Sequence, residues 1–372
     1  MKFRLRLSSR VGIKRNTAQS ERLLKLLDGL PLAIAQAGAY LQESGVGLEK
    51  YLAFYEQQWR ELMKSRDWVN APLQDYPDRS VWTTWAISYK AIQDKHPATA
   101  NLLLLWSFLD NRDLWYGLFS AAYQYSKVAE KMLTDWIGDI ARNELEFSMA
   151  MQVLRNYSLI EHTEELASYA THPVVHRWAY HYQGKCFQSN LARLAVGTVG
   201  WAVVDSSAKD YSAMQRRLLP HAQASSRWVS TQIGRSSRSQ RDCGMDRSRS
   251  EEKAVILVAI RRLGRLYMDQ GKLNEAEKMY EQALRGYQRA LGPKHRSTLH
   301  AVNNLGLLFA NQGKLDVAKK MYEQALQGYE EALGPKHTST LHTVSNITRP
   351  PLREPRKARG GREDVRAGTA RV

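Results

Sequence analysis

Cysteine is scarce in this sequence, because Cys186 and Cys243 are the only two among 372 residues. They lie far apart and form no C-x-x-C pair, which excludes a disulfide framework or a zinc ribbon and favours a reducing compartment. Long apolar runs are missing too. The longest, Leu102 to Leu109, is far shorter than the ~20 residues of a membrane helix, and the N-terminus lacks the apolar stretch of a signal peptide. We therefore expect a cytoplasmic protein without membrane contact.

A phosphate-binding loop is also missing, since G-x-x-x-x-G-K-[ST] occurs nowhere in the sequence. Such a loop supplies the backbone N–H groups, the lysine and the hydroxyl that hold phosphates and Mg²⁺. Stabilisation of phosphate charge is most of what catalysis of phosphoryl transfer requires. No G-x-S-x-G motif or Cys/His pairing stands out either. We predict that the chain is not an enzyme and has no catalytic residues.

The positive charge is concentrated in three segments. The chain carries a formal net charge of +17, of which residues 1–17, 235–250 and 349–372 contribute +6, +3 and +5. All three are poor in apolar residues and rich in Ser, Gly, Pro or Arg, which is typical of disordered tails and linkers. Two alternatives stay open: nucleic-acid binding by the tails, or a truncated or mis-joined gene product.

An internal repeat is the strongest pattern in the sequence. Residues 257–298 and 299–340 align at a period of 42 with 27 identities. A repeat of this length is one helix–turn–helix unit. In the first copy we expect Gly264 and Ala276 to bring the two helices close together, with a turn at Gln270-Gly271.

Each complete copy also carries a tyrosine in its second helix. We expect Tyr280 and Tyr322 to fill the space between the second helix of their own unit and the first helix of the next. A third copy begins at Leu341 and breaks off within its first helix. Because about three units are usually needed for stability, loss of Tyr280 should cost more than loss of Tyr322.

At these residues the chain resembles a tetratricopeptide array of the 42-residue kind found in kinesin light chains and in many fungal and bacterial signalling proteins. The resemblance implies a groove that binds a protein or peptide ligand. We expect surface residues on the first helix of each copy to contribute to that groove. They are Arg261 and Arg262 in the first copy and Asn303 and Asn304 in the second. The recurring His295 and His337 lie in the loops between units and are expected to serve the repeat structure.

Upstream of the repeats, apolar residues recur at spacings of three and four, which predicts helices. Gly29 and Pro31 fit the start of a helix that is rich in alanine. A helix near Glu144 to Asn156 is followed by two short runs around a polar turn, and a helix followed by a hairpin is typical of a winged helix. Pro173 then begins another helix.

The order of GLPLA (29–33), SVWTTWAISYKAI (80–92), the helix–hairpin and THPVVHRWA (171–179) resembles the rear half of an NB-ARC module, the nucleotide switch of STAND and NOD-like signalling proteins. In that family the proline of GLPLA lines the adenine site and a histidine after the wing contacts the β-phosphate of ADP. The matching positions are Pro31 and His172. Thr171-His172-Pro173 replaces the usual Met-His-Asp, and the resemblance implies ADP or ATP only if a phosphate loop outside this chain is supplied.

Two other kinds of site are not expected. His172 and His176 share the spacing of metal-binding histidines, but Pro173 places His172 before the first turn and no glutamate follows it, so we predict no metal site. The helix that would read DNA carries Glu144 and Glu146, whereas phosphate contacts need Lys or Arg. Nucleic-acid binding by the folded part is therefore not expected.

Taken together, these patterns predict a mainly α fold: a helical ARC-like bundle, a winged-helix-like domain with a small β-hairpin, and then an α-solenoid. The expected segments are a basic tail (1–16), an ARC1-like segment (17–70), a winged-helix-like domain (71–185), a helical connector (186–232), an Arg/Ser-rich linker (233–250), the repeats (251–347) and a second basic tail (348–372). The predicted function is protein recognition by a piece of a STAND-like signalling protein. The alternatives are part of a nucleotide-dependent switch, a kinesin-light-chain-like adaptor or a nucleic-acid binder through the tails. The sequence leaves the oligomeric state open.

Overall fold

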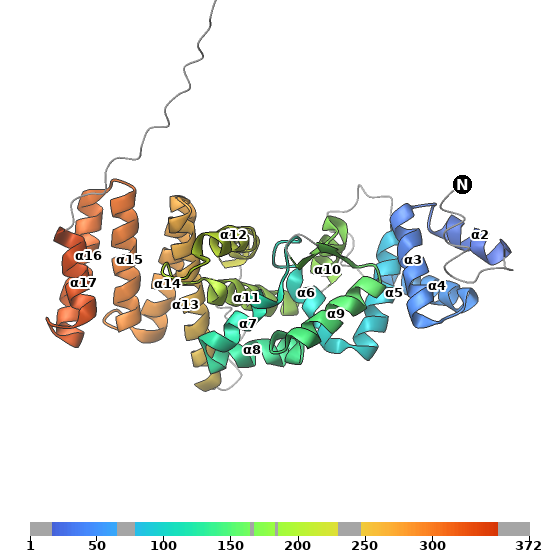
Figure 1. Cartoon of the computed structure of the whole chain (residues 1–372), viewed down its shortest axis with the longest axis horizontal. Coiled ribbons are helices and arrows are strands. Elements are labelled where there is room, and N and C mark those ends of the chain that lie inside the picture. The colour runs from blue at the N-terminus through green and yellow to red at the C-terminus, as the bar shows by residue number, and fades with distance from the viewer. Residues whose placement is uncertain (1–16, 65–78, 164–166, 183–184, 230–246, 349–372) are drawn as a thin grey trace, which may run out of the picture. The chain divides into compact units, whose positions relative to one another are not determined.

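The computed structural model describes residues 17–64, 79–163, 167–182, 185–229 and 247–348. Outside these ranges lie the first predicted tail, the second tail from residue 349 on, all but the last residues of the predicted linker, and the C-terminal part of the ARC1-like segment. Thr348, the first residue of the second predicted tail, is helical. Within them the chain is mainly α-helical, with a single two-stranded hairpin, which confirms the predicted fold class (Figure 1). The chain divides into two compact units, 1–286 and 287–372, which are described separately.

The first unit begins with a helical bundle. It comprises α2 (Thr17–Leu26), α3 (Pro31–Ser44), α4 (Leu48–Lys64) and α5 (Arg79–Lys95), and α5 packs against both α3 and α4. As predicted, Pro31 is the first residue of α3, where its fixed φ suits the helix and its missing N–H needs no partner. Ala33 and Ala37 are fully buried, so the small side chains of α3 serve close packing against neighbouring helices.

The middle of the first unit is built around buried aromatic side chains. Its elements are α6 (Pro97–Trp106), α7 (Tyr116–Tyr125), α8 (Lys127–Ile137), the 3-10 turn η2 (Gly138–Ala141), α9 (Glu144–Asn156), β1 (Ile160–Thr163), β2 (Ser168–Thr171) and α10 (Pro173–Tyr182). Trp85 and Trp178 pack with ring centroids 6.1 Å apart and join α5 to α10. The two strands pair antiparallel, with Ile160 opposite Thr171. A helix followed by a hairpin is therefore present where the sequence predicts it, while its assignment as a winged helix stays a prediction.

The connector consists of α11 (Lys185–Ala202) and α12 (Tyr211–Trp228). At the end of α12, Trp228 stacks on Tyr180 of α10 with ring centroids 5.0 Å apart, and both rings contact Phe108 edge-on. These three rings anchor the connector to the middle of the unit, because aromatic pairs in such geometries stabilise beyond the area they bury.

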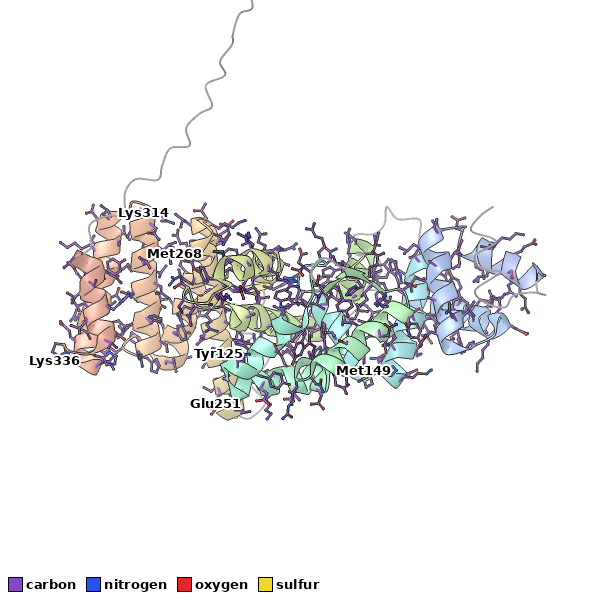
Figure 2. All side chains as sticks on the ribbon, in the orientation of Figure 1. Tyr125, Met149, Glu251, Met268, Lys314 and Lys336 are labelled. Carbon is purple, nitrogen blue, oxygen red and sulfur yellow. The ribbon has the colours of Figure 1, made fainter. Side chains whose placement is uncertain are left out.

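The repeats form regular antiparallel helix pairs. Their helices are α13 (Arg247–Asp269), α14 (Leu273–Leu291), α15 (Arg296–Asn311), α16 (Leu315–Leu333) and α17 (Thr338–Thr348). Gly271 and Gly313 have φ angles of 70° and 78°, the left-handed conformation that the predicted turns need and that glycine adopts without strain. Lys314, labelled at the start of α16 in Figure 2, donates its backbone N–H to the Phe309 carbonyl at 2.9 Å, which closes the turn.

Two histidines cap helices of the second unit. Nδ1 of His295 accepts the N–H of Ser297 at 3.1 Å, and Nδ1 of His337 accepts the N–H of Ser339 at 3.1 Å. Each ring satisfies one of the donors left free at a helix start. These contacts support the structural role that the sequence predicts for both residues.

Candidate functional site

Pro31, the predicted adenine contact, is exposed at the start of α3. The preceding turn is tight, with φ angles of 50° at Asp28 and 67° at Gly29. Within that helix, the buried Gln36 side chain donates to the carbonyl of Ser158, in the turn between α9 and β1. The structure thus fixes the start of α3 against the helix–hairpin segment, and nucleotide contact by Pro31 stays a prediction.

His172, the predicted phosphate contact, is also exposed and directly follows β2. Its Nδ1 accepts the N–H of Val174 at 3.3 Å. This is the same cap that His295 and His337 make at the starts of α15 and α17. A capping role therefore accounts for His172 locally, and its contact with a phosphate stays a prediction.

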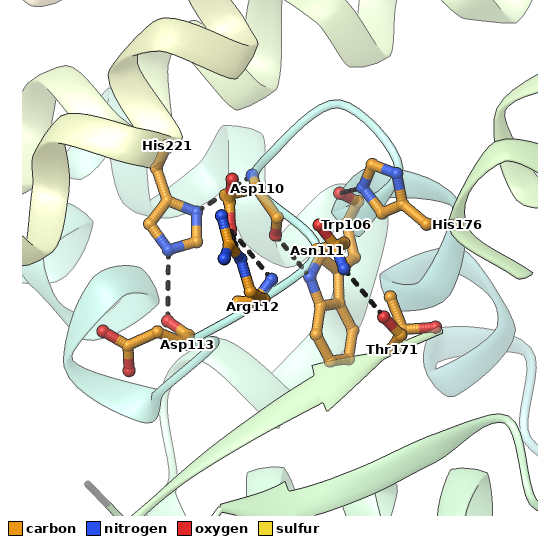
Figure 3. Close-up of polar contacts among 8 residues, drawn as sticks. All are labelled: Trp106, Asp110, Asn111, Arg112, Asp113, Thr171, His176 and His221. Atoms are coloured by element: carbon orange, nitrogen blue, oxygen red, sulfur yellow. Dashed lines mark hydrogen bonds and ion pairs between the residues drawn. The ribbon is translucent and has the colours of Figure 1, made fainter. Parts of the chain in front are cut away.

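A cluster that the sequence did not predict lies in the loop between α6 and α7. We call it the polar junction: residues 110–115 together with the side chains of α10 and α12 that hold them. Figure 3 shows Asp110 to Asp113 of this loop with His176 of α10 and His221 of α12. The loop runs alongside β2. Leu114 and Tyr169 exchange two backbone hydrogen bonds of 2.8 Å, and the side chain of Asn111 donates to the carbonyl of Thr171 at 3.0 Å. The loop thereby extends the hairpin by a third short strand-like segment.

His221 of α12 is the centre of the polar junction. Its Nδ1 accepts the backbone N–H of Asp110 at 3.2 Å, so this nitrogen carries no proton. Its Nε2 therefore carries the proton and donates to the carbonyl of Asp113 at 3.1 Å. The side chain is fully buried. The neutral imidazole thus satisfies one donor and one acceptor of the loop backbone at once.

Burial lowers the pKa of His221, although the Asp113 carbonyl and the carboxylates of Asp110 and Asp113 act in the opposite direction. Arg217, one turn earlier in α12, lowers it further. Protonation would also place a second donor against the N–H of Asp110. Both geometry and burial therefore keep the ring neutral.

Arg217 makes the second contact between α12 and the loop. Its guanidinium donates to both carboxylate oxygens of Asp113, at 2.7–3.0 Å, and lies 4.0 Å from the ring centroid of Trp115. Asp113 has a φ of 58°, so its backbone is held in the left-handed region. Arginine suits this place because its planar fork binds a carboxylate and stacks on an aromatic ring together.

His176 of α10 supports the other end of the loop. Its Nε2 contacts the carbonyl of Trp106 at 3.0 Å, and the indole of Trp106 donates to the carbonyl of Asp110 at 2.8 Å. Burial lowers the pKa of His176. His172 and His176 have the spacing of metal-binding histidines, but His172 caps a helix and His176 contacts a backbone carbonyl. The described residues contain no cluster of three metal-ligating side chains.

The two repeats use the same small-to-large contacts. A Cβ added to Gly264 would lie 2.7 Å from the ring of Tyr280, and one added to Gly306 would lie 2.7 Å from the ring of Tyr322. Each tyrosine is buried. This supports the predicted role of Gly264 in close helix packing. Each tyrosine also packs on the first helix of its own repeat, a contact that the sequence does not predict.

The four predicted groove residues differ in their surroundings. Arg262 donates to the carbonyl of Trp201 at 3.2 Å and lies 4.9 Å from the ring centroid of Tyr125, the last residue of α7, which is labelled in Figure 2. Arg262 is therefore occupied within the first unit. Arg261, its neighbour on α13, is half-buried.

Asn303 is not a surface residue, which corrects its expected placement. It is buried, and its Oδ1 accepts hydrogen bonds of 3.3 Å from Thr343 and from Asn346, both in α17. A buried amide must find partners within the protein, and α17 supplies them. Asn304 is half-buried on α15. Partner binding by these four residues stays a prediction, and Arg261 and Asn304, each in its own unit, have partly exposed side chains.

Comparison with known proteins agrees with these features. Residues 254–331 match the family described as Tetratricopeptide repeat. The chain is 23% identical over 289 residues to a "Nucleotide-binding leucine-rich repeat (NLR)-like protein" from Hyaloscypha variabilis, a match that covers 75% of this chain and 25% of the relative. The chain thus spans about a quarter of the length of that relative. These findings confirm the predicted resemblance to a fungal NLR-like protein with tetratricopeptide repeats.

In addition, no helix in the described part of the chain is long and apolar enough to cross a membrane.

Proposed function

We propose that this chain is a non-enzymatic piece of an NLR-like signalling protein and that its repeats bind a protein or peptide partner. The observation that carries the proposal is the repeat itself, because residues 254–331 match tetratricopeptide repeats and fold as paired helices. Repeats of this kind contact only their neighbours and create extended surfaces that suit protein partners. The similarity to an NLR-like protein supports the signalling context.

The proposed contact residues are Arg261 on α13, in the first unit, and Asn304 on α15, in the second unit, and both are half-buried. Both have the partly exposed surroundings of residues that can gain contacts on binding. Arg262 and Asn303 are each engaged within their own unit, since the first donates to the carbonyl of Trp201 and the second accepts a hydrogen bond from Thr343 of α17. Loss of their contacts should act through stability of the repeats.

The test is quantitative affinity capture with the full chain and two charge-reversal variants, R261E and K319E. Lys319 is exposed on α16, a second helix, and serves as the matched control. We expect a set of proteins that wild type and K319E retain and R261E loses. Equal capture by all three chains would contradict the proposed surface.

A second candidate function is part of an ADP- or ATP-dependent switch whose phosphate loop lies outside this chain. The exposed starts of α3 and α10, with Pro31 and His172, favour it. We expect this chain alone to bind ADP no more tightly than about millimolar, because phosphate charge lacks its cradle of N–H groups and lysine. Titration calorimetry with ADP tests this, and a micromolar Kd that falls on substitution of Pro31 or His172 would favour the switch.

A further inference from the structure

The last helix of the described part of the chain, α17, has an exposed apolar face. Leu341 and Val344 of α17 are 56% and 39% exposed. Thr348, also exposed, lies one further turn along the same side of the helix. The opposite side is buried, since Thr340 and Thr343 pack inward, and α17 lies beside α16 (Figure 1). Two adjacent apolar side chains on one helix side form a surface that another element can cover.

The two complete repeats show what covers this face. Leu257 and Leu299 occupy the place of Leu341 in the 42-residue period. A Cβ added to Gly286 would lie 2.2 Å from Leu257, and one added to Gly328 would lie 2.3 Å from Leu299. In both repeats, therefore, the leucine is seated on a glycine of an antiparallel helix.

The third copy departs from the others at one position. Thr348 stands where the complete repeats have Gly264 and Gly306. Both glycines lie under a tyrosine ring, with only 2.7 Å between the ring and an added Cβ. A threonine adds that Cβ and two further heavy atoms, so a tyrosine cannot occupy the corresponding place over Thr348.

We propose that the face formed by Leu341, Val344 and Thr348 binds an amphipathic α-helix of a partner protein. This helix places a glycine or another very small residue on Leu341. Six residues earlier, where the repeats of this chain have tyrosine, it has a small residue over Thr348. The inference goes beyond the proposed function, because it uses the end of α17 and none of the polar residues of the first helices.

The chain itself supplies a suitable probe. A labelled peptide with the sequence of residues 315–333 carries Gly328 and Tyr322 at the two positions that matter. Peptides of this length are only marginally helical in water, so ordering on binding reduces their affinity, and relative values are the useful measure. Fluorescence anisotropy with the full chain compares this peptide with its Y322A form.

We expect the Y322A peptide to bind wild-type chain at least about tenfold more tightly than the unmodified peptide, a difference of about 1.4 kcal/mol. In the T348G chain the preference should reverse, because the glycine again accepts the tyrosine ring. Comparing both peptides on wild type and on T348G shows whether the preference comes from the fit at Thr348 or from a general change in the helix content of the peptide.

Two variants of the full chain serve as controls. L341E should lose the Y322A peptide, because it places a charge on the apolar contact. L145E alters another exposed leucine, on α9, and should bind like wild type. Circular dichroism checks that both are folded. Absence of binding by the Y322A peptide, binding that survives L341E, or equal binding of both peptides to wild type and T348G would each overturn the proposal.

Discussion

The first repeat and the polar junction are built in opposite ways. In the repeat, Gly264 and Tyr280 are 16 residues apart in the sequence and in contact in the fold. The large tyrosine ring packs where the glycine has no side chain. In the junction, His221 reaches backbone groups of Asp110 and Asp113 more than 100 residues away. The repeat depends on shape, whereas the junction depends on satisfying polar groups of a buried loop.

This difference determines how each region should fail. A cavity in the repeat costs the packing of many atoms, and the loss grows with the size of the residue removed. In the junction, removal of one ring leaves a backbone donor and an acceptor without partners. The junction should also respond to pH, since its central contact needs a neutral histidine.

The largest effect is expected from Tyr280→Ala. Removing a buried aromatic ring should lower the free energy of unfolding of α13 and α14 by about 3–5 kcal/mol. Hydrogen exchange by mass spectrometry measures this for these helices alone. The exposed Lys278→Ala on the same helix should change it by less than about 0.5 kcal/mol.

Tyr322→Ala sharpens the comparison within the repeats. Because Tyr322 rests on Gly306 of its own repeat, as Tyr280 rests on Gly264, both losses now have an intrarepeat part of similar size. If contact with the following unit dominated, Tyr322→Ala would lower the free energy of unfolding clearly less than Tyr280→Ala does. Hydrogen exchange measures the free energy of unfolding of α15 and α16 in Tyr322→Ala. If Tyr322→Ala lowers it by less than half the amount that Tyr280→Ala lowers it in α13 and α14, contacts with neighbouring helices dominate.

The next effect is expected from His221→Phe, which keeps a ring but removes both hydrogen bonds. The unpaired N–H of Asp110 and carbonyl of Asp113 should lower the stability of the junction by about 1–3 kcal/mol. Exchange of the Asp110 amide reports this directly. His172→Ala, which loses one exposed cap, should cost less than about 1 kcal/mol, and equal losses would contradict the central place given to His221.

Lowering the pH should weaken the junction in the same way. The folded state holds the pKa of His221 below its ordinary value of about 6.5, so the unfolded state takes up protons first as the pH falls. Stability is therefore fully present above about pH 7 and declines toward pH 5. His176 shifts in the same direction, so His221→Phe should flatten the decline without abolishing it. Unfolding by urea at several pH values measures the slope.

The smallest effect is expected from Arg217→Lys. The ion pair with Asp113 is partly exposed, and lysine keeps the charge while it loses the two-pronged contact and the stacking on Trp115. We expect a loss of at most about 1 kcal/mol by the same urea experiment. A loss larger than that of His221→Phe would move the centre of the junction to the ion pair.

The sequence predicts a structural feature correctly where its residues recur at a fixed period, or where a glycine or proline marks a turn or a helix start. The repeat glycines, the turn at Gly271 and the start of α3 at Pro31 are all visible as patterns, and the structure places them as predicted. The predicted surface position of Asn303 is wrong because a polar residue on a helix is expected outside, and its partners Thr343 and Asn346 on α17 come 40 and 43 residues later. The junction was missed altogether, since a single histidine bound to backbone groups leaves no spacing to recognise.

Recognition of a protein through the first helices of the repeats is the central function proposed for this chain. The direct measurement is the affinity of one purified protein, obtained by the capture experiment, for wild-type chain, R261E and K319E by titration calorimetry. We predict a Kd that rises at least about tenfold in R261E and stays unchanged in K319E. An unchanged Kd in R261E, or a loss confined to K319E, would contradict the claim and transfer recognition to the second helices.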